Sequence, residues 1–185
     1  MTYMPINDAE ADRTLMERIR NGGGDGNTAF AQLYDKYANR IYGYVRKMLL
    51  DHPVLIDDVY QTTFVKFYEQ IAAGTVIENT GGYLLRIARN LALNELAKRR
   101  RLVFTTEDIH MAASNHESND LGALLDHALQ QLPDDYRESV ILREHTGLDY
   151  TEIAELTGQT EATIRQRVSR GKAMLRQILA PILDR

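Results

Sequence analysis

Apolar residues recur along most of the chain at steps of three and four, the spacing that places them on one face of an α-helix. The first such stretch spans residues 30–48, and a second spans residues 56–71 after the break at Pro53. A third spans residues 83–101. No segment alternates convincingly between apolar and polar positions, as a half-buried strand would. The pattern therefore predicts an all-α fold.

Interruptions of this pattern indicate where helices and domains end. Residues 72–82, "AAGTVIENTGG", contain three glycines and are expected to form a loop. Residues 102–119 are polar and lack a sustained apolar stripe, which is typical of a linker between domains. Helical spacing resumes at residues 121–132, breaks at Pro133, and continues in a further helix that Gly147 ends.

We therefore predict two small helical domains, residues 27–101 and residues 120–185, joined by a flexible linker at residues 102–119. Residues 1–26 form an N-terminal extension that can be helical in part. Its run "NGGGDG", residues 21–26, is interpreted as a flexible turn. A phosphate-binding loop would need a Lys-Ser/Thr pair and a preceding strand, and neither is present in the sequence.

The start of the C-terminal segment predicts a helix-turn-helix. Asp149 and Glu152 have the spacing of a capping box at the beginning of a short helix. Gly158 suits the left-handed position that ends such a helix, and Thr160 can cap the next one. Two helices joined by a three-residue turn that contains glycine form a helix-turn-helix motif.

The second helix of this motif has a distinct apolar side. At 100° per residue, its buried stripe of Ile164, Val168, Gly171 and Leu175 lies within about 60° of arc. The other side is small or polar and is bordered by arginine, and its residues are Ala162, Thr163, Arg165, Gln166, Ser169 and Arg170. A helix fits the major groove of DNA, and Gln and Arg can hydrogen-bond base edges. This side therefore favours DNA recognition over an ordinary solvated face.

Charge is distributed unevenly along the chain. The net charge is -4 and the pI is about 5.7. Residues 83–101 nevertheless contain six Lys and Arg against one acid, and residues 161–176 contain five against one. Residues 107–135, between them, contain seven acids and no Lys or Arg. Two basic segments of this kind suggest two contacts with a polyanion.

Three motifs, in this order, resemble the extracytoplasmic-function (ECF) type of bacterial RNA polymerase sigma factor in the sigma-70 family. The run "LIDDVYQTTFVKFYEQI" resembles region 2.2, and "YLLRIARNLALNELAKRRR" resembles region 2.4. The C-terminal part resembles region 4 through Leu132-Pro133, Arg137, "GLDYTEIA" and the helix-turn-helix that follows. The helix-turn-helix alone would be weakly specific, but the three motifs in order are highly specific.

The resemblance implies that residues 27–101 form the region 2 bundle and residues 120–185 form region 4. Region 2.2 would dock on the β′ clamp helices of core RNA polymerase through Asp58, Gln61 and Phe64. Regions 2.3 and 2.4 would melt the minus-ten promoter element and hold its non-template strand through Asn79, Thr80, Tyr83, Arg86, Arg89, Asn90 and Asn94. Region 4 would pack on the β flap and read the minus-35 duplex through Thr160, Ala162, Thr163, Arg165, Gln166, Arg167, Ser169 and Arg170.

The resemblance also implies a specificity subunit of polymerase with no catalytic site, no cofactor and no metal. Promoter DNA and an anti-sigma factor, which such proteins usually have, are the further expected partners. The chain departs from the family pattern at Thr62, where an acid is usual, and at Tyr83, where Trp is common. The first departure bears on polymerase docking, and the second leaves open whether this aromatic residue packs in the core or meets a base.

Cysteine content, the length of apolar runs and the N-terminal sequence indicate where in the cell the protein is located. The absence of cysteine suits a reducing cytoplasm, and no apolar run approaches the roughly 20 residues that span a bilayer. The polar N-terminus does not resemble a secretory signal. We expect a cytoplasmic protein without stable membrane insertion.

Two alternative functions remain open from the residues alone. A dimeric helix-turn-helix repressor or activator would use residues 30–101 for dimerisation or ligand binding. A metal-dependent nucleic-acid enzyme is less favoured. The five histidines show no ligand spacing and suit the surface, and Asp57-Asp58 has no further acids nearby in the sequence.

Overall fold

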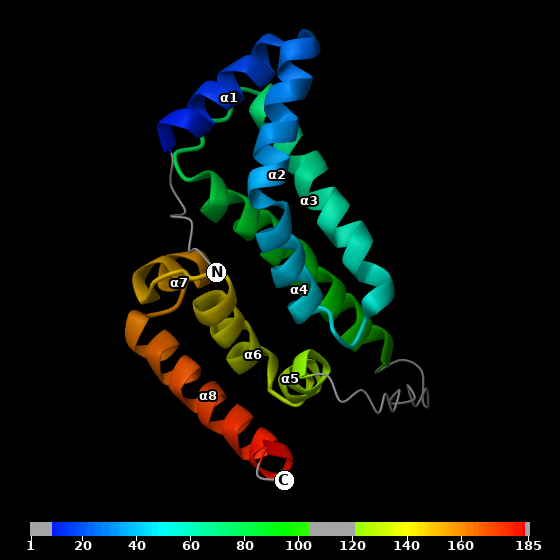
Figure 1. Cartoon of the computed structure of the whole chain (residues 1–185), viewed down its shortest axis with the longest axis vertical. Coiled ribbons are helices and arrows are strands. Elements are labelled where there is room, and N and C mark those ends of the chain that lie inside the picture. The colour runs from blue at the N-terminus through cyan, green and yellow to red at the C-terminus, as the bar shows by residue number, and fades with distance from the viewer. Residues whose placement is uncertain (1–8, 104–120, 184–185) are drawn as a thin grey trace. The chain divides into compact units, whose positions relative to one another are not determined.

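The computed structural model describes residues 9–103 and 121–183, and every regular element in these stretches is a helix (Figure 1). The predicted all-α fold is confirmed. The chain divides into two compact units, the first formed by residues 9–45 and 54–94. The second contains Arg46–Pro53 and the described residues from Glu95 onward. None of the described helices is long and apolar enough to cross a membrane.

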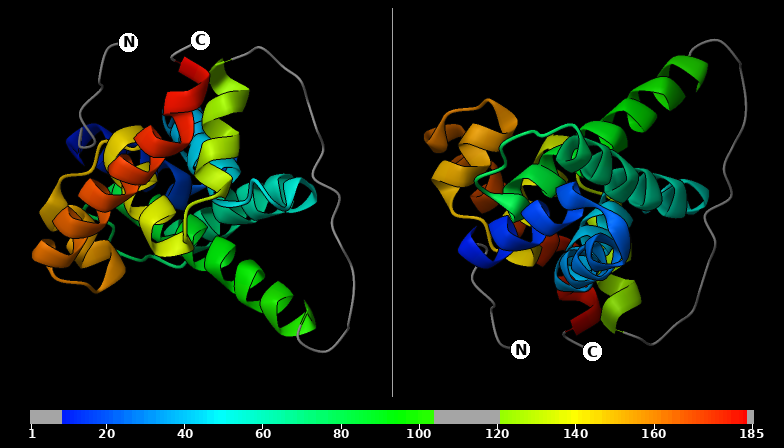
Figure 2. Two further views of the ribbon diagram at one scale, coloured as in Figure 1. Left: turned by 90° about the horizontal axis from the view of Figure 1, so that it is seen from below. Right: turned by 90° about the horizontal axis from the view of Figure 1, so that it is seen from above.

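Residues 104–119 of the predicted linker lie outside the described residues, and its first two residues end a helix. The helices of the first unit, two of which continue into the second, are α1 (Ala9–Asn21), α2 (Gly23–Met48), α3 (Ile56–Ala72) and α4 (Thr80–Val103), with a 3-10 turn, η1 (Pro53–Leu55), before α3. In Figures 1 and 2, α1 lies against the end of the bundle that carries the α3–α4 loop.

The predicted apolar stripe of α2 forms the core of the first unit. Leu33, Ile41 and Tyr44 are fully buried. Tyr37 is also buried, so two tyrosines of this stripe belong to the core. Tyr34 differs, because 36% of its surface stays exposed at the edge of the bundle.

The interpretation of residues 21–26 as a flexible turn is wrong. Helix α1 ends at Asn21 and α2 begins at Gly23, so Gly22 alone separates them. The Arg18 guanidinium donates to both carboxylate oxygens of Asp25, which lowers the pKa of that carboxyl. Asp25 also lies in the first turn of α2, where the helix dipole favours an acid. A β-carbon on Gly26 would lie 3.2 Å from the Arg18 carbonyl oxygen, so the two helices approach closely here.

The second unit contains α5 (Leu121–Gln130), α6 (Asp134–Val140), α7 (Tyr150–Thr157) and α8 (Glu161–Leu183). The helix expected between Pro133 and Gly147 is present, but its second half is a π-helix, η2 (Ile141–His145). The backbone N–H of Thr146 accordingly donates to the Ile141 carbonyl, five residues earlier, at 3.1 Å. Hydrophobic spacing does not distinguish a single π turn from an α-helix, so the π turn was not predicted.

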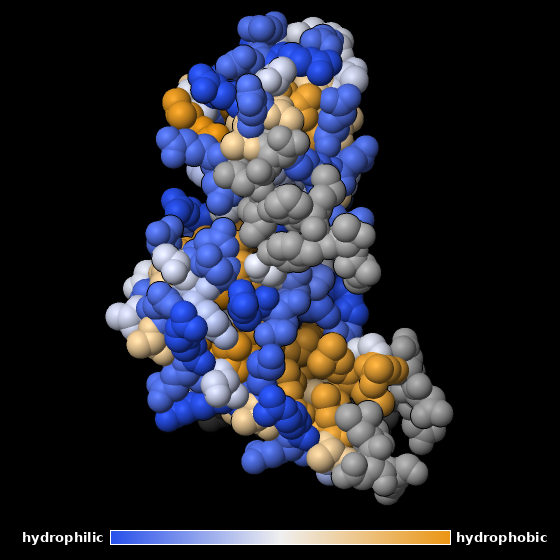
Figure 3. Space-filling view, turned by 60° about the vertical axis from the view of Figure 1, so that its left-hand side comes forward, coloured by the Kyte–Doolittle hydropathy of each residue, from blue (hydrophilic) through white to orange (hydrophobic). Residues whose placement is uncertain are grey.

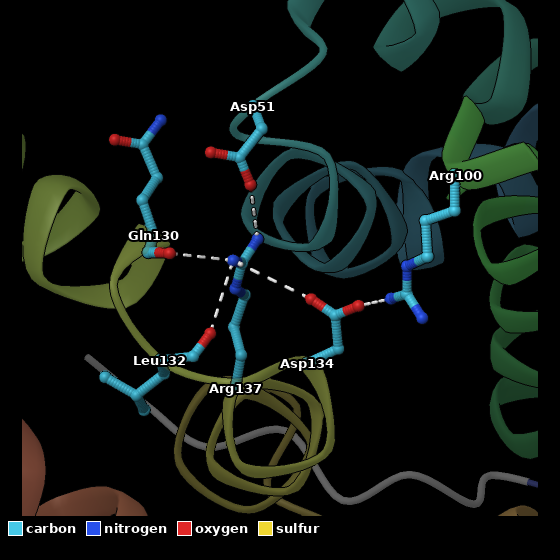
Figure 4. A network of polar contacts seen from close by, with 6 residues as sticks. All are labelled: Asp51, Arg100, Gln130, Leu132, Asp134 and Arg137. Atoms are coloured by element: carbon cyan, nitrogen blue, oxygen red, sulfur yellow. Dashed lines mark hydrogen bonds and ion pairs between the residues drawn. The ribbon is translucent and has the colours of Figure 1, made fainter. Parts of the chain in front are cut away.

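A buried arginine joins three segments of the second unit (Figure 4). Arg137 of α6 donates to the Asp51 carboxylate at 2.8 Å and to the Gln130 carbonyl at 2.9 Å. It also lies 3.8 Å from the carboxylate of Asp134, which pairs in turn with Arg100. A buried cation needs such partners, because removing them would leave an uncompensated charge.

Candidate nucleic-acid and polymerase interfaces

The predicted helix-turn-helix is confirmed in detail. The N–H of Glu152 donates to the Asp149 carboxylate at 2.8 Å, and the N–H of Asp149 donates to the Glu152 carboxylate at 2.8 Å, which completes the capping box. Gly158 ends α7 with a φ of 69°. The Thr160 hydroxyl accepts from the N–H of Thr163 at 3.1 Å and thereby caps α8.

The two sides of α8 follow the predicted register. Ile164 and Val168 are buried, and Leu175 is half-buried. A β-carbon on Gly171 would lie 2.7 Å from Cγ2 of Val140, so α6 and α8 touch at this point. The exposed residues of the other side are Ala162, Arg165, Gln166, Ser169 and Arg170. Thr163 and Arg167 are half-buried at its borders.

Most cations of α8 pair with carboxylates. Arg165 pairs with Glu161 of the same helix. Arg167 donates to Asp135 of α6 at 2.7 Å, and Lys172 donates to Glu144 of η2 at 3.1 Å. Neighbouring helices thus bring carboxylates to a helix that contains one acid of its own, and these pairs were not predicted from the sequence. Arg170 and Gln166 are exposed and make no hydrogen bond or ion pair with any described residue.

Arg165 also stacks on an aromatic ring. Its guanidinium lies 4.3 Å from the ring centre of Tyr150, and that of Arg143 lies 4.8 Å from the same ring. Tyr150 is the first residue of α7, so the first helix of the motif orients a side chain of the second. This contact was not predicted, since nothing in helical spacing relates position 150 to position 165.

One face of α4 presents free polar groups at steps of four. Arg86, Asn90 and Asn94 are exposed and bond no other described residue. Arg89 is half-buried. The Tyr83 ring is also half-buried, 6.5 Å from the ring of Phe67, so this aromatic residue rests on the bundle with one side in solvent.

The two predicted minus-ten residues at the start of α4 have structural partners. The Asn79 side chain accepts from the N–H of Gly82 at 2.8 Å and caps the helix. A β-carbon on Gly82 would lie 3.0 to 3.2 Å from the Asn79 side chain, so a glycine accommodates the cap. Thr80 is buried, and its side chain hydrogen-bonds the Tyr37 hydroxyl.

The predicted docking residues of α3 fall into two groups. Asp58 and Gln61 are exposed on the first turns of the helix. Phe64 is only 4% exposed and packs 4.7 Å from the Tyr34 ring and 5.3 Å from the Tyr60 ring. A groove of about 390 Å³ beside it is lined mainly by aromatic side chains, together with Gln61. The aromatic wall was not predicted, because its residues come from α2 and α3.

An apolar groove lies within the second unit. It has a volume of about 430 Å³, and its apolar lining comes from Leu125, Leu129, Val140, Ile141 and Leu175. Figure 3 shows apolar side chains gathered at the height of α5 and the C-terminal part of α8. Lys47, Lys172 and Arg176 also line the groove, with Glu144 and His145, so it combines an apolar floor with a mostly basic rim.

A helical bundle with an exposed polar stripe on α4, together with a unit that ends in a helix-turn-helix, defines a class of DNA-binding transcription proteins. Matches to two family models identify the family within this class. The model for Sigma-70 region 2 matches residues 33–102, and the model for Sigma-70, region 4 matches residues 123–175. The chain belongs to the sigma-70 family of RNA polymerase sigma factors and is of the ECF type.

Individual relatives agree over nearly the full length. RNA polymerase sigma-H factor of Pseudomonas aeruginosa is 31% identical, over 94% of this chain and 96% of the relative. RNA polymerase sigma factor CarQ of Myxococcus xanthus is 32% identical, over 90% and 97%. Among solved structures, the sigma factor RpoE of Bartonella quintana, crystallised with the anti-sigma factor NepR, is 25% identical with a TM-score of 0.68. That match covers 82% of this chain and 96% of the other.

Proposed function

We propose that this protein binds core RNA polymerase and directs transcription initiation at specific promoters, as a specificity subunit without catalysis of its own. The observation that carries the proposal is the outward side of α8, where Arg165, Gln166 and Arg170 project opposite buried Ile164 and Val168. In a helix-turn-helix this helix enters the major groove. Its side chains would read the minus-35 duplex there.

The remaining predicted minus-35 residues would contact DNA beside the outward side of α8. The hydroxyls of Thr160 and Thr163 lie 2.8 Å apart at the start of α8 and would contact a phosphate at this helix N-terminus. Arg167 stays in the proposed set, but a phosphate would compete with Asp135 for its guanidinium. Arg165 would reach a base from its position over Tyr150.

The polar stripe of α4 supports the proposed contact with the melted minus-ten element. Arg86 can hold a phosphate, and Asn90 and Asn94 can hydrogen-bond the edges of unstacked bases. Asn79 and Thr80 would serve the strand by shaping the loop and the start of α4. Tyr83 offers a half-exposed ring on which a base could stack.

Two surfaces support the proposed contacts with proteins. Asp58 and Gln61 on α3, beside the aromatic groove, would meet the β′ clamp helices of polymerase. The apolar groove between α5, η2 and α8 is of the kind that receives an amphipathic helix, and the proposed contact with the β flap would lie there. An anti-sigma factor is a further proposed partner, since the related RpoE was crystallised with one. We place these events in the cytoplasm.

Promoter opening tests the proposal. Polymerase and this protein are incubated with promoter DNA selected by the holoenzyme, and permanganate then detects unpaired thymines near the minus-ten element. Opening should require core polymerase and should fall when Arg86, Arg89 and Asn90 are changed together to Ala. Free protein should bind DNA weakly. Tight, salt-resistant binding of the free protein to a palindromic duplex, with no dependence on polymerase, would instead support a dimeric repressor.

A further inference from the structure

Helix α1 precedes the residues that the family models match, yet it contacts one end of the α3–α4 loop directly and the other end through Tyr37 of α2. This helix was predicted only as an N-terminal extension. It is part of the first unit, with Met16 and Ile19 buried in the core and α3 packed beside it. Its polar side chains are therefore held in fixed positions relative to the loop.

The first contact fixes the beginning of the loop. Arg20 donates from Nε to the Ile71 carbonyl at 3.2 Å and from its terminal nitrogen to the Thr75 carbonyl at 2.7 Å. Between these two residues the chain turns through Gly74, whose φ is +83°. One guanidinium thus joins the last turn of α3 to the first residue after the turn.

The second contact fixes the end of the loop. The Asp12 carboxylate is 1% exposed and accepts from Lys36 Nζ at 2.6 Å and from the Tyr37 hydroxyl. Because the Tyr37 proton points to Asp12, its oxygen remains to accept from Thr80, the first residue of α4. Burial and the Asp12 carboxylate raise the pKa of Tyr37, which keeps the phenol neutral and able to donate.

The middle of the loop has little support of its own. Val76 is 80% exposed, and Glu78 is also exposed. A hollow of about 670 Å³ lies between α1 and residues 76–78. Ile77 is the buried residue of this stretch. Besides Ile77, the loop is therefore held at its two ends, by Arg20 of α1 and by Tyr37 of α2, which Asp12 of α1 orients.

We propose that Asp12 and Arg20 are positioning residues that hold residues 75–80 in the conformation that receives the melted minus-ten strand. The inference rests on the proposed function, because it assumes that this loop and the start of α4 contact that strand. Neither residue needs to touch DNA. Asp12 acts through Tyr37 and Thr80, and Arg20 acts through the backbone carbonyls.

Two variants sever the two contacts with little change of shape. Tyr37→Phe keeps the ring in the core and removes the hydroxyl that joins Asp12 to Thr80. Arg20→Ala removes an exposed side chain. The matched control is Arg18→Ala, two residues away on α1, because Arg18 bonds Asp25 of α2 and makes no hydrogen bond or ion pair with the loop.

The measurement compares two probes of reconstituted holoenzyme. One is the non-template strand of the minus-ten element from a promoter that the holoenzyme selects in vitro, and the other is the minus-35 duplex of the same promoter. We expect Tyr37→Phe and Arg20→Ala to weaken strand binding about tenfold, as for groups that act through others. Binding of the duplex and of core polymerase should not change. Arg20→Lys should restore part of the loss, since its ammonium can still donate to one carbonyl.

Two outcomes would overturn the inference, and a third would refute the proposed function on which it rests. Strand affinity of both variants equal to wild type would show that the loop keeps its position without α1. An equal loss in Arg18→Ala would show a general loosening of α1. A wild-type holoenzyme that does not distinguish the minus-ten strand from a scrambled strand would refute the proposed function itself, which is a separate result. Should Tyr37→Phe unfold the unit, the exposed Arg20→Ala variant decides.

Discussion

Gly171 lies where α8 crosses α6, and its missing side chain is what allows the contact. A β-carbon there would lie 2.7 Å from Val140 Cγ2 and 3.4 Å from the Tyr136 carbonyl oxygen. We expect Gly171→Ala to lower the free energy of unfolding by about 1–3 kcal/mol, because overpacking outweighs the better helix propensity of Ala. Thermal unfolding followed by circular dichroism measures the change.

Gly24 of α2 provides the control for this substitution. It is helical, and nothing lies within 4 Å of a β-carbon built there. Gly24→Ala should leave stability unchanged or raise it by about 0.4–1 kcal/mol. A Gly171→Ala protein as stable as wild type would mean that α6 moves aside at no cost.

The outward side of α8 makes a separate prediction about DNA. Arg165→Ala or Gln166→Ala should weaken minus-35 binding or change its base preference by about 1–3 kcal/mol, as expected for a lost base contact. Ile164→Asp should instead unfold the second unit, since Ile164 is fully buried. Binding selections with each variant report the change, and an unaltered sequence preference and affinity in both outward variants would refute the face assignment.

At the scale of single residues, the sequence predicted which side of α8 is buried, but it did not predict which cations of α8 are paired with carboxylates. Spacing alone placed Ile164 inside and Gln166 outside, because rotation about a helix axis depends only on sequence separation. Which cations are paired depends on contacts between helices. Asp135 reaches Arg167 from 32 residues away, and Glu144 reaches Lys172 from 28 residues away. No local pattern carries that information.

Helix α3 presents the proposed contact with polymerase. Asp58→Ala combined with Gln61→Ala should lower affinity for core polymerase while helical circular dichroism stays unchanged, because both side chains are exposed. Asp57→Ala is the matched control, as an exposed acid one position earlier that faces a different direction. Equal pull-down of core enzyme by wild type and double mutant would contradict the docking surface.

An alanine variant of Phe64 would not test the docking surface. The residue is buried between Tyr34 and Tyr60, and its truncation should cost about 3–5 kcal/mol of stability. A loss of polymerase binding in Phe64→Ala would therefore report unfolding as readily as docking. Its proposed role is best understood as support for the aromatic groove beside Gln61.

We expect the stability of the second unit to depend on pH, because of a histidine in the segment between α2 and η1. His52 is half-buried, unlike the surface position expected for it, and its Nδ1 lacks a hydrogen-bond partner among the described residues. Burial, together with Arg99 and Arg137, lowers the pKa of His52, and Asp51 opposes them in part. The unfolded chain takes up a proton near pH 6.5, which the folded unit resists.

Stability should therefore be full above about pH 6.5 and should fall as the pH drops below it. Thermal midpoints measured from pH 7.5 to 5.5, above the range in which ordinary carboxylates titrate, report this loss. His52→Gln should flatten the dependence. A wild type whose midpoint is constant over this range would show that His52 ionises without cost in the folded state.

Most elements were predictable from the sequence, and the exceptions have physical causes. Helices α2, α3 and α4 follow stripes long enough to specify their faces, as in Leu33 and Ile41 of α2. The start of α2 was missed because glycine-rich sequence has low helix propensity. A tertiary contact, Arg18 with Asp25, overrides that propensity. The site residues were recognised mainly through family resemblance, and the buried role of Thr80 depends on Tyr37, 43 positions earlier.

In the folded protein, acids and cations that are distant in the sequence form ion pairs, which a count of charged residues along the chain does not reveal. In the second unit, acids of the middle segment neutralise cations that the sequence assigned to basic patches. Asp134 pairs with Arg100, and Asp135 pairs with Arg167. We therefore expect a free protein with net charge -4 and several of its cations paired to have little attraction for DNA. This agrees with the expectation that specific binding needs core polymerase.

Freeing one of these cations should therefore increase DNA binding by the protein alone. Asp135→Asn leaves Arg167 without its carboxylate, and the guanidinium then becomes available to a phosphate. We expect the affinity for duplex DNA to rise, and the plot of log affinity against log salt concentration to steepen by about one, the change for one added phosphate contact.

Glu155→Gln is the matched control, because it alters net charge equally at an exposed acid that pairs with no described cation. Titrations of labelled duplex at several salt concentrations separate the two effects. If both variants steepen the plot equally, net charge alone governs binding. If neither does, Arg167 does not reach the phosphates and its proposed place at the minus-35 interface is lost.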